Sequence, residues 1–94
     1  MAKYNVVKSA QFKRDVKVAK KSGLDMEKLE LVIAVLQADG TLPPKNRDHA
    51  LKGEWVGARE CHIAPDWLLV YKKIHEELKL MLLRTGSHAK LELE

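Results

Sequence analysis

The spacing of hydrophobic residues changes character halfway along this 94-residue chain. In the first half, apolar residues recur every three or four positions, a spacing that places them on one face of a helix. It predicts one helix that begins after Ser9 and stops near Gly23, and a second that runs from about Asp25 towards Gly40. The apolar positions are Phe12, Val16 and Ala19 in the first helix, and Met26, Leu29, Ile33 and Leu36 in the second. Together the two helices predict a hairpin that packs on another element.

A spacing of two replaces the helical spacing in the second half and predicts strands. The clearest example is "ARECHIA" at residues 58–64. Successive side chains of a strand point to opposite faces of its sheet. Cys61 and Ile63 therefore lie on one side of this predicted strand, and Glu60 and His62 lie on the other.

The order of the elements predicts an α+β fold. Residues 40–55 contain two prolines and two glycines, so we expect them to be mostly loop. The other expected strands are "KYNVV" at 3–7, "WLLVYKK" at 67–73 and "ELKLMLLR" at 77–84, with a turn at 74–77. We expect a single domain over residues 1–94, in which an N-terminal strand and the helical hairpin pack on an antiparallel sheet of about four strands.

Composition and charge narrow the class of protein. The formal net charge is +4 and the isoelectric point is near 9.3, which favours an anionic partner. The one cysteine, Cys61, has no partner for an internal disulfide, so we expect a reducing, cytoplasmic environment. The chain lacks an apolar run near the ~20 residues that a membrane span needs, and its first residues lack the apolar region of a signal peptide, so we expect no membrane partner.

Three of the four histidines lie in polar, turn-rich contexts: His49, His62 and His88. A metal site is weakly indicated, because the spacing matches no compact ligand motif and Cys61 points away from His62. A second possible role of these histidines is proton transfer in the cleavage of RNA. A base takes the 2′-hydroxyl proton, an acid protonates the leaving 5′-oxygen, and a cation such as Arg84 steadies the phosphate. The simpler interpretation is that these histidines are solvated surface residues. The residues alone leave both this interpretation and proton transfer on RNA open.

The turn "PDW" and two lysines of the first helix can likewise be interpreted as structural or as functional. In the turn "PDW", Asp66 caps the turn or orients a histidine, and Trp67 fills the core or stacks on a base. Lys13 and Lys17 lie beside the apolar stripe of the first helix, where they form a solvated face or follow phosphates.

Longer motifs resemble a known family. "RDHALKGEWVGARECHIAPDWLLVYK" at 47–72 is followed by "RTGSHAKL" at 84–91. In these segments "DHxLxGxW", "R(D/E)xHxxPDWLLVY" and "RTGSH" occur in order, with gaps that match the YafQ branch of the RelE/ParE superfamily of bacterial toxins. The resemblance includes the N-terminal helical hairpin, so it covers nearly the whole chain. The architecture of that family, two helices on an antiparallel sheet, is similar to the fold predicted above.

The resemblance implies an activity. Toxins of this branch are ribosome-dependent endoribonucleases that cut translated mRNA in the ribosomal A site, so we expect an enzyme that needs neither a metal nor another cofactor. It implies an acidic cognate antitoxin as partner, besides ribosome and mRNA, with DNA reached only through the antitoxin. The implied roles are proton transfer for His88, support for His49 and His62, orientation for Asp66, phosphate stabilisation for Arg84, and RNA binding or support for Trp67, Lys13 and Lys17.

One departure from the family pattern bears on these roles. The branch usually ends in "HxxLF", whereas Glu92 stands where that aromatic residue would be. This departure supports a non-catalytic alternative, a protein that only binds the ribosome or RNA. A second alternative rests on the fold alone: a gyrase inhibitor of the same fold. The set of histidines argues against the gyrase inhibitor, because an inhibitor that acts by binding needs no proton-transfer groups.

Overall fold

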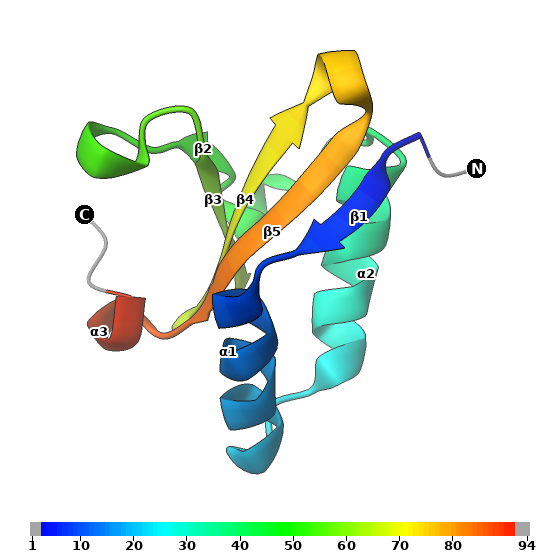
Figure 1. Ribbon diagram of the computed structural model, residues 1–94. Helices are drawn as coiled ribbons and strands as arrows, with labels where there is room; N and C mark the ends of the chain where they lie inside the picture. Colours follow the sequence, from blue (N-terminus) through cyan, green and yellow to red (C-terminus); the bar gives the residue numbers. More distant parts are fainter. Residues whose placement is uncertain (1–2, 92–94) are drawn as a thin grey trace.

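A computed structural model describes residues 3–91 of the chain (Figure 1). Glu92, at the position of the missing aromatic, lies outside the described residues. The helices are α1 (Ala10–Lys21), α2 (Met26–Gln37) and α3 (His88–Leu91). The strands are β1 (Asn5–Lys8), β2 (His49–Ala50), β3 (Arg59–Ala64), β4 (Trp67–Ile74) and β5 (Lys79–Gly86). Short 3-10 turns are η1 (Pro44–Asn46), η2 (Gly53–Trp55) and η3 (His75–Glu77).

The helical hairpin forms as its capping residues predict. The Ser9 hydroxyl accepts a hydrogen bond from the backbone N–H of Phe12, and the Asp25 carboxylate accepts one from Glu27. Each cap thus satisfies a backbone donor that the first turn of a helix leaves free. Gly23, just beyond α1, adopts a φ of 82°, a left-handed conformation that costs glycine little.

Among residues 3–91 the sheet has five strands, where about four were expected, and one of its pairings is parallel. Its strand order is β1-β5-β4-β3-β2. β1 pairs with β5 in parallel, whereas the other neighbours are antiparallel. The predicted α+β fold with an antiparallel sheet is confirmed for β2 to β5, and β1 adds a parallel strand at the edge, which the sequence pattern did not specify. β2 lies within the expected loop and is too short to show a periodicity.

The two faces of the sheet have different coverings. Leu69, Tyr71 and Leu82 belong to the main core, which α1 and α2 cover. Leu68 and Val70 alternate with them and belong to a smaller core on the opposite face, together with Leu51, Ala58 and Leu91. Figure 1 shows the same division, with α1 and α2 on one side of the sheet and α3 and the η2 turn on the other.

The register aligns polar residues on the face that α1 and α2 leave free. Glu60 on β3 lies opposite Val70 on β4, which in turn lies opposite Arg84 on β5. Directly opposed residues of neighbouring strands share a face. Glu60 and Arg84 therefore flank Val70 on the face of the smaller core.

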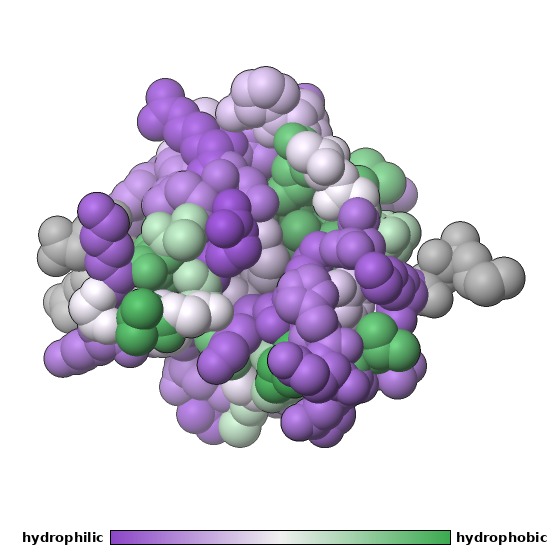
Figure 2. Space-filling model, turned by 90° about the horizontal axis from the view of Figure 1, so that it is seen from above, coloured by the Kyte–Doolittle hydropathy of each residue, from purple (hydrophilic) through white to green (hydrophobic). Residues whose placement is uncertain are grey.

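The face of the molecule shown in Figure 2 is mostly hydrophilic. Seen from above, charged and polar side chains separate several small apolar patches (Figure 2). Within residues 3–91, no helix combines the length and the apolar character needed to cross a membrane.

Candidate active site

The pairing of β2 with β3 gathers two histidines around one carboxylate. His49 lies opposite Glu60, and His62 follows two positions along β3 on the same face. Oε1 of Glu60 is 3.6 Å from Nε2 of His49 and 3.8 Å from Nε2 of His62. These distances exceed those of hydrogen bonds, so the three groups face one another without a direct bond.

His88 joins this group from the other end of the chain. It begins α3, with one residue between it and the end of β5 at Gly86, and its ring centroid lies 5.3 Å from that of His62. Oδ1 of Asp66, in the β3–β4 turn, accepts hydrogen bonds from the backbone N–H of His88 at 3.1 Å and from its Nδ1 at 2.9 Å. Asp66 therefore fixes both the start of α3 and the orientation of the ring.

The contact with Asp66 also fixes where the proton of His88 lies. An ionised carboxylate only accepts hydrogen bonds, so Nδ1 must carry a proton. In the neutral ring Nε2 then carries the lone pair, which is the position from which a histidine acts in proton transfer. The hydrogen bonds from the ring and backbone of His88 hold the pKa of Asp66 below its usual value, so Asp66 is ionised at neutral pH.

His49 is fixed in the same way. Its Nδ1 lies 2.7 Å from the carbonyl oxygen of Arg47, which only accepts, so this nitrogen donates. In the neutral ring its Nε2 therefore carries the lone pair, and it faces Glu60. In both His49 and His88, Nδ1 donates to a protein oxygen, so Nε2 is the ring nitrogen left for proton transfer.

Glu60 is a site residue that the sequence analysis missed. It is only 2% exposed, and its Oε2 has no hydrogen-bond partner among the described residues. A buried carboxylate oxygen without a partner is costly, and such groups often occur at functional sites. The alternation in "ARECHIA" placed Glu60 on the same side as His62 and could have identified it.

Arg84 lies at the edge of this face. Its guanidinium donates to Asp15 of α1, with Nε 2.8 Å from Oδ2 and Nη2 3.3 Å from Oδ1. Its side chain remains 23% exposed. A guanidinium has five N–H donors, so Arg84 keeps donors for a phosphate while Asp15 holds it.

The structure does not bring the remaining predicted residues to the histidines. Trp67 is 3% exposed in the main core, and its Nε1 donates to Thr85 at 2.9 Å. It lies on the α1 and α2 side of the sheet, so it supports the fold and is not open to stacking on a base. Lys13 and Lys17 are exposed on α1 and point away from its buried side, which faces the sheet.

Comparison with known proteins gives consistent relatives. A family model described as "Bacterial toxin of type II toxin-antitoxin system, YafQ" matches residues 4–93. The protein of Escherichia coli K12 called "mRNA interferase toxin YafQ" is 39% identical over 92 residues, a match that covers 97% of this chain and 98% of that protein.

Solved structures show the same likeness. The crystal structure of the E. coli DinJ–YafQ toxin–antitoxin complex matches with a TM-score of 0.86 at 39% identity, covering 95% of this chain and 97% of the other. The crystal structure of a metal-bound toxin from Helicobacter pylori matches with a TM-score of 0.89 at 41% identity, covering 97% and 99%.

The metal-bound relative raises the question whether this chain could hold an ion. Glu60, His62 and His88 each offer a ligand atom, and these atoms lie within 4.8 Å of one another. Two imidazoles and a carboxylate suit a transition metal, and the unpartnered Oε2 of Glu60 fits a ligand role. These three residues would hold the ion, which when bound would supply a Lewis acid. The expectation of chemistry without a metal stays a prediction.

Proposed function

We propose that this chain, which belongs to the YafQ family of bacterial toxins of type II toxin–antitoxin systems, is an mRNA interferase. It acts as a single toxin domain in the cytoplasm and cuts translated mRNA in the ribosomal A site by proton transfer, without a metal. The observation that carries the proposal is the meeting of His88, His62 and Glu60 on one face of the sheet, with Asp66 orienting His88.

The reaction needs two proton-transfer groups that reach different oxygens of one phosphodiester, the 2′-oxygen and the 5′-oxygen. One group takes the proton of the 2′-hydroxyl, whose oxygen then attacks the phosphorus atom. The bond to the 5′-oxygen breaks, and the second group protonates that oxygen, which leaves a cyclic phosphate and a free 5′-hydroxyl. Nε2 of His88 supplies one of these groups, and Glu60, with His49 and His62 around it, supplies the other.

Charge on the phosphate is stabilised by Arg84. The guanidinium of arginine gives charge-assisted hydrogen bonds to phosphate oxygens. Arg84 flanks Val70 on the same face of the sheet as Glu60, which supports this role. His49 and His62 add positive charge near the phosphate whenever they are protonated.

A cognate antitoxin is the expected regulator, since the E. coli relative was solved with the antitoxin DinJ. We propose that the antitoxin of this chain is acidic and docks in a groove of about 630 Å³ between α2 and the end of β3. Its lining is aliphatic, with Leu31, Val35 and Ile63, and suits protein side chains better than bases, which stack on aromatic rings. Lys28 and Lys45 supply complementary charge.

The position of the groove connects binding with inhibition. His62 is part of its lining, so an antitoxin segment seated there contacts β3, the strand that also carries Glu60. The toxin itself needs no contact with DNA, which is reached only through the antitoxin.

Primer extension on an mRNA translated in vitro tests the proposal. The reaction compares the wild-type protein with His88→Ala and with His75→Gln as a matched control. His75 lies at η3, where its ring contacts Tyr4, away from the other histidines. We expect breaks at codon-phased positions that disappear with His88→Ala and persist with His75→Gln.

Three outcomes contradict parts of the proposal. Normal cutting by His88→Ala overturns the role of His88. Intact mRNA with the wild-type protein bound to ribosomes indicates an inhibitor that only binds. Loss of gyrase supercoiling with normal translation indicates the gyrase-inhibiting alternative.

A further inference from the structure

Asp15 is an unusual residue for the buried side of a helix. It lies in α1 between Phe12 and Ala19, and all three are buried. The residue as a whole is 1% exposed, and its side chain is fully buried. An ionised carboxylate is strongly disfavoured in such a place unless several donors compensate for the lost water.

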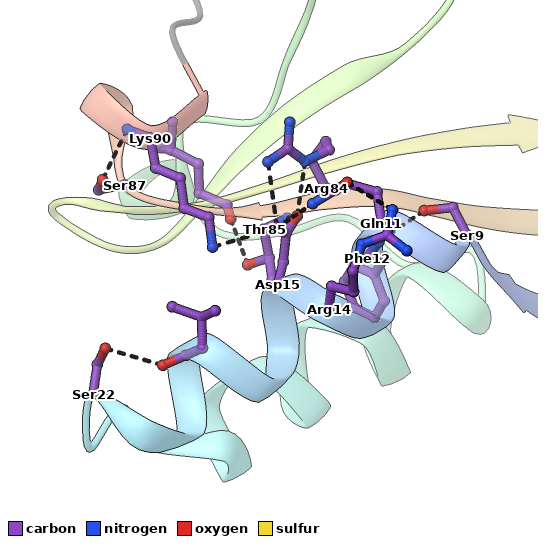
Figure 3. A network of polar contacts seen from close by, with 12 residues as sticks. Ser9, Gln11, Phe12, Arg14, Asp15, Ser22, Arg84, Thr85, Ser87 and Lys90 are labelled. Atoms are coloured by element: carbon purple, nitrogen blue, oxygen red, sulfur yellow. Dashed lines mark hydrogen bonds and ion pairs between the residues drawn. The ribbon is translucent and has the colours of Figure 1, made fainter.

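Four groups provide that compensation, as Figure 3 shows. Arg84 donates through Nε at 2.8 Å and Nη2 at 3.3 Å, and the backbone N–H of Thr85 donates at 3.1 Å. Gln11 donates at 3.1 Å from the preceding turn of α1, and Nζ of Lys90 lies 3.4 Å away. Burial raises the pKa of Asp15, but the hydrogen bonds from Arg84, Gln11 and Thr85 outweigh it and leave the pKa lowered.

Three of these four groups belong to one short segment that includes His88. Arg84 and Thr85 end β5, and Lys90 lies in α3. β1 pairs with β5 only as far as Leu82, so the backbone N–H of Thr85 lies at a free edge that Asp15 covers. Asp15 therefore holds the segment from the α1 side, and Asp66 holds His88 from the other side.

Gly86 allows this arrangement. Its φ is +156°, and a Cβ at this position would lie 3.0 Å from Cδ of Lys90. A larger residue would push away the side chain that reaches Asp15. The "RTGSH" segment thus combines a phosphate-binding cation, a close approach of α3 and a proton-transfer group.

We propose that Asp15 is a positioning residue of the nuclease, which holds the guanidinium of Arg84 towards the substrate phosphate and, through Lys90, holds the turn that carries His88. The inference rests on the proposed function. A carboxylate that served only the fold would stabilise the protein without changing the rate of the folded enzyme, and this difference can be measured.

Asp15→Asn removes the charge and keeps the shape, and Asp39→Asn is the matched control. Asp39 also binds two cations, Lys3 and Lys73, each at 2.8 Å, but at the other end of β4. The readouts are thermal unfolding, steady-state cleavage of ribosome-bound mRNA at varied concentrations, and the NMR signal of the Arg84 Nε–H. We expect Asp15→Asn to lower kcat by roughly tenfold to a hundredfold with a smaller change in KM. The reason is that a misplaced Arg84 or His88 slows the chemical step more than it weakens substrate binding.

Two further results are expected. The Arg84 Nε–H signal should lose its protection in Asp15→Asn and keep it in Asp39→Asn. In an Arg84→Ala background, Asp15→Asn should lower kcat much less than in the wild type, because residues that act as a unit are not additive. If Asp15→Asn does not fold, Lys90→Met removes one contact at the surface and should still shift the His88 ring signals and lower kcat.

The outcomes separate the two proposals. An active wild type with kcat of folded Asp15→Asn within about twofold of normal overturns the inference alone. The inference is also overturned if Asp15→Asn and Arg84→Ala lower kcat by independent factors that multiply in the double variant. An unchanged kcat in Lys90→Met overturns it as well. A wild-type protein that leaves mRNA intact overturns the proposed function and the inference with it.

Discussion

Replacing Trp67 with Phe separates support of the fold from contact with RNA. The indole of Trp67 is buried, and its Nε1–H donates to the hydroxyl of Thr85 at 2.9 Å. That hydroxyl in turn donates to the carbonyl of Leu68 at 2.7 Å. Phe removes the first hydrogen bond and leaves the second in place, so the substitution tests the contribution of the bond between Trp67 and Thr85.

The loss of stability follows from two terms. A buried hydrogen bond contributes about 1 kcal/mol net to the free energy of unfolding. The smaller ring leaves unfilled volume, which costs about 1 kcal/mol more. A total of about 2 kcal/mol lowers the Tm of a domain this size by roughly 8–16 °C.

The cleavage rate of the folded protein should not change. Trp67 lies on the face that α1 and α2 cover, opposite the histidines. The assay measures thermal unfolding by circular dichroism and single-turnover cleavage of mRNA well below the Tm. Trp55→Phe is the control, because Trp55 is half-buried and its loss should lower the Tm less.

A particular pair of results would refute this reasoning. If Trp67→Phe keeps the wild-type Tm but loses cleavage, the ring contacts RNA directly and is not a core residue in the working enzyme. If the Tm falls as expected and cleavage persists, the role of Trp67 is structural.

Three other predictions concern catalysis, pH and the antitoxin. Glu60→Gln should lower kcat by roughly 10²–10⁴-fold with little change in KM, since a lost proton-transfer group has this effect, and an unchanged rate would remove Glu60 from the reaction. Because the folded-state pKa of Asp66 is lowered, its stabilising contact with His88 is complete above pH 3.8 and is lost as pH falls through the lowered value. The difference in unfolding free energy between wild type and Asp66→Asn should therefore vanish in acid, and a constant difference would contradict this assignment. Lys45→Glu should weaken antitoxin binding about tenfold and reduce its salt dependence, whereas Lys13→Glu on the outer side of α1 should not, and equal effects would argue against the groove.

Local patterns in the sequence determined much of the fold. Helix caps and strand alternation depend on residues within a few positions of one another, so Ser9, Asp25 and the two sides of "ARECHIA" could be interpreted without tertiary information. The site was partly accessible in the same way. The residue types in "PDW" and "RTGSH" suited proton transfer and phosphate binding, and the contact of Asp66 with His88 agrees with the expected orienting role.

Only the tertiary structure decided which of these groups meet. Arg84 and Asp15 are 69 positions apart, and the apolar stripe of α1 gave no indication that one of its positions holds a buried charge. The parallel pairing of β1, the burial of Trp67 and the place of Glu60 between two histidines likewise depend on how strands from different parts of the chain align. A local pattern sets the face on which a side chain lies, but the identity of its neighbours depends on long-range packing. The chemistry of this site depends on those neighbours.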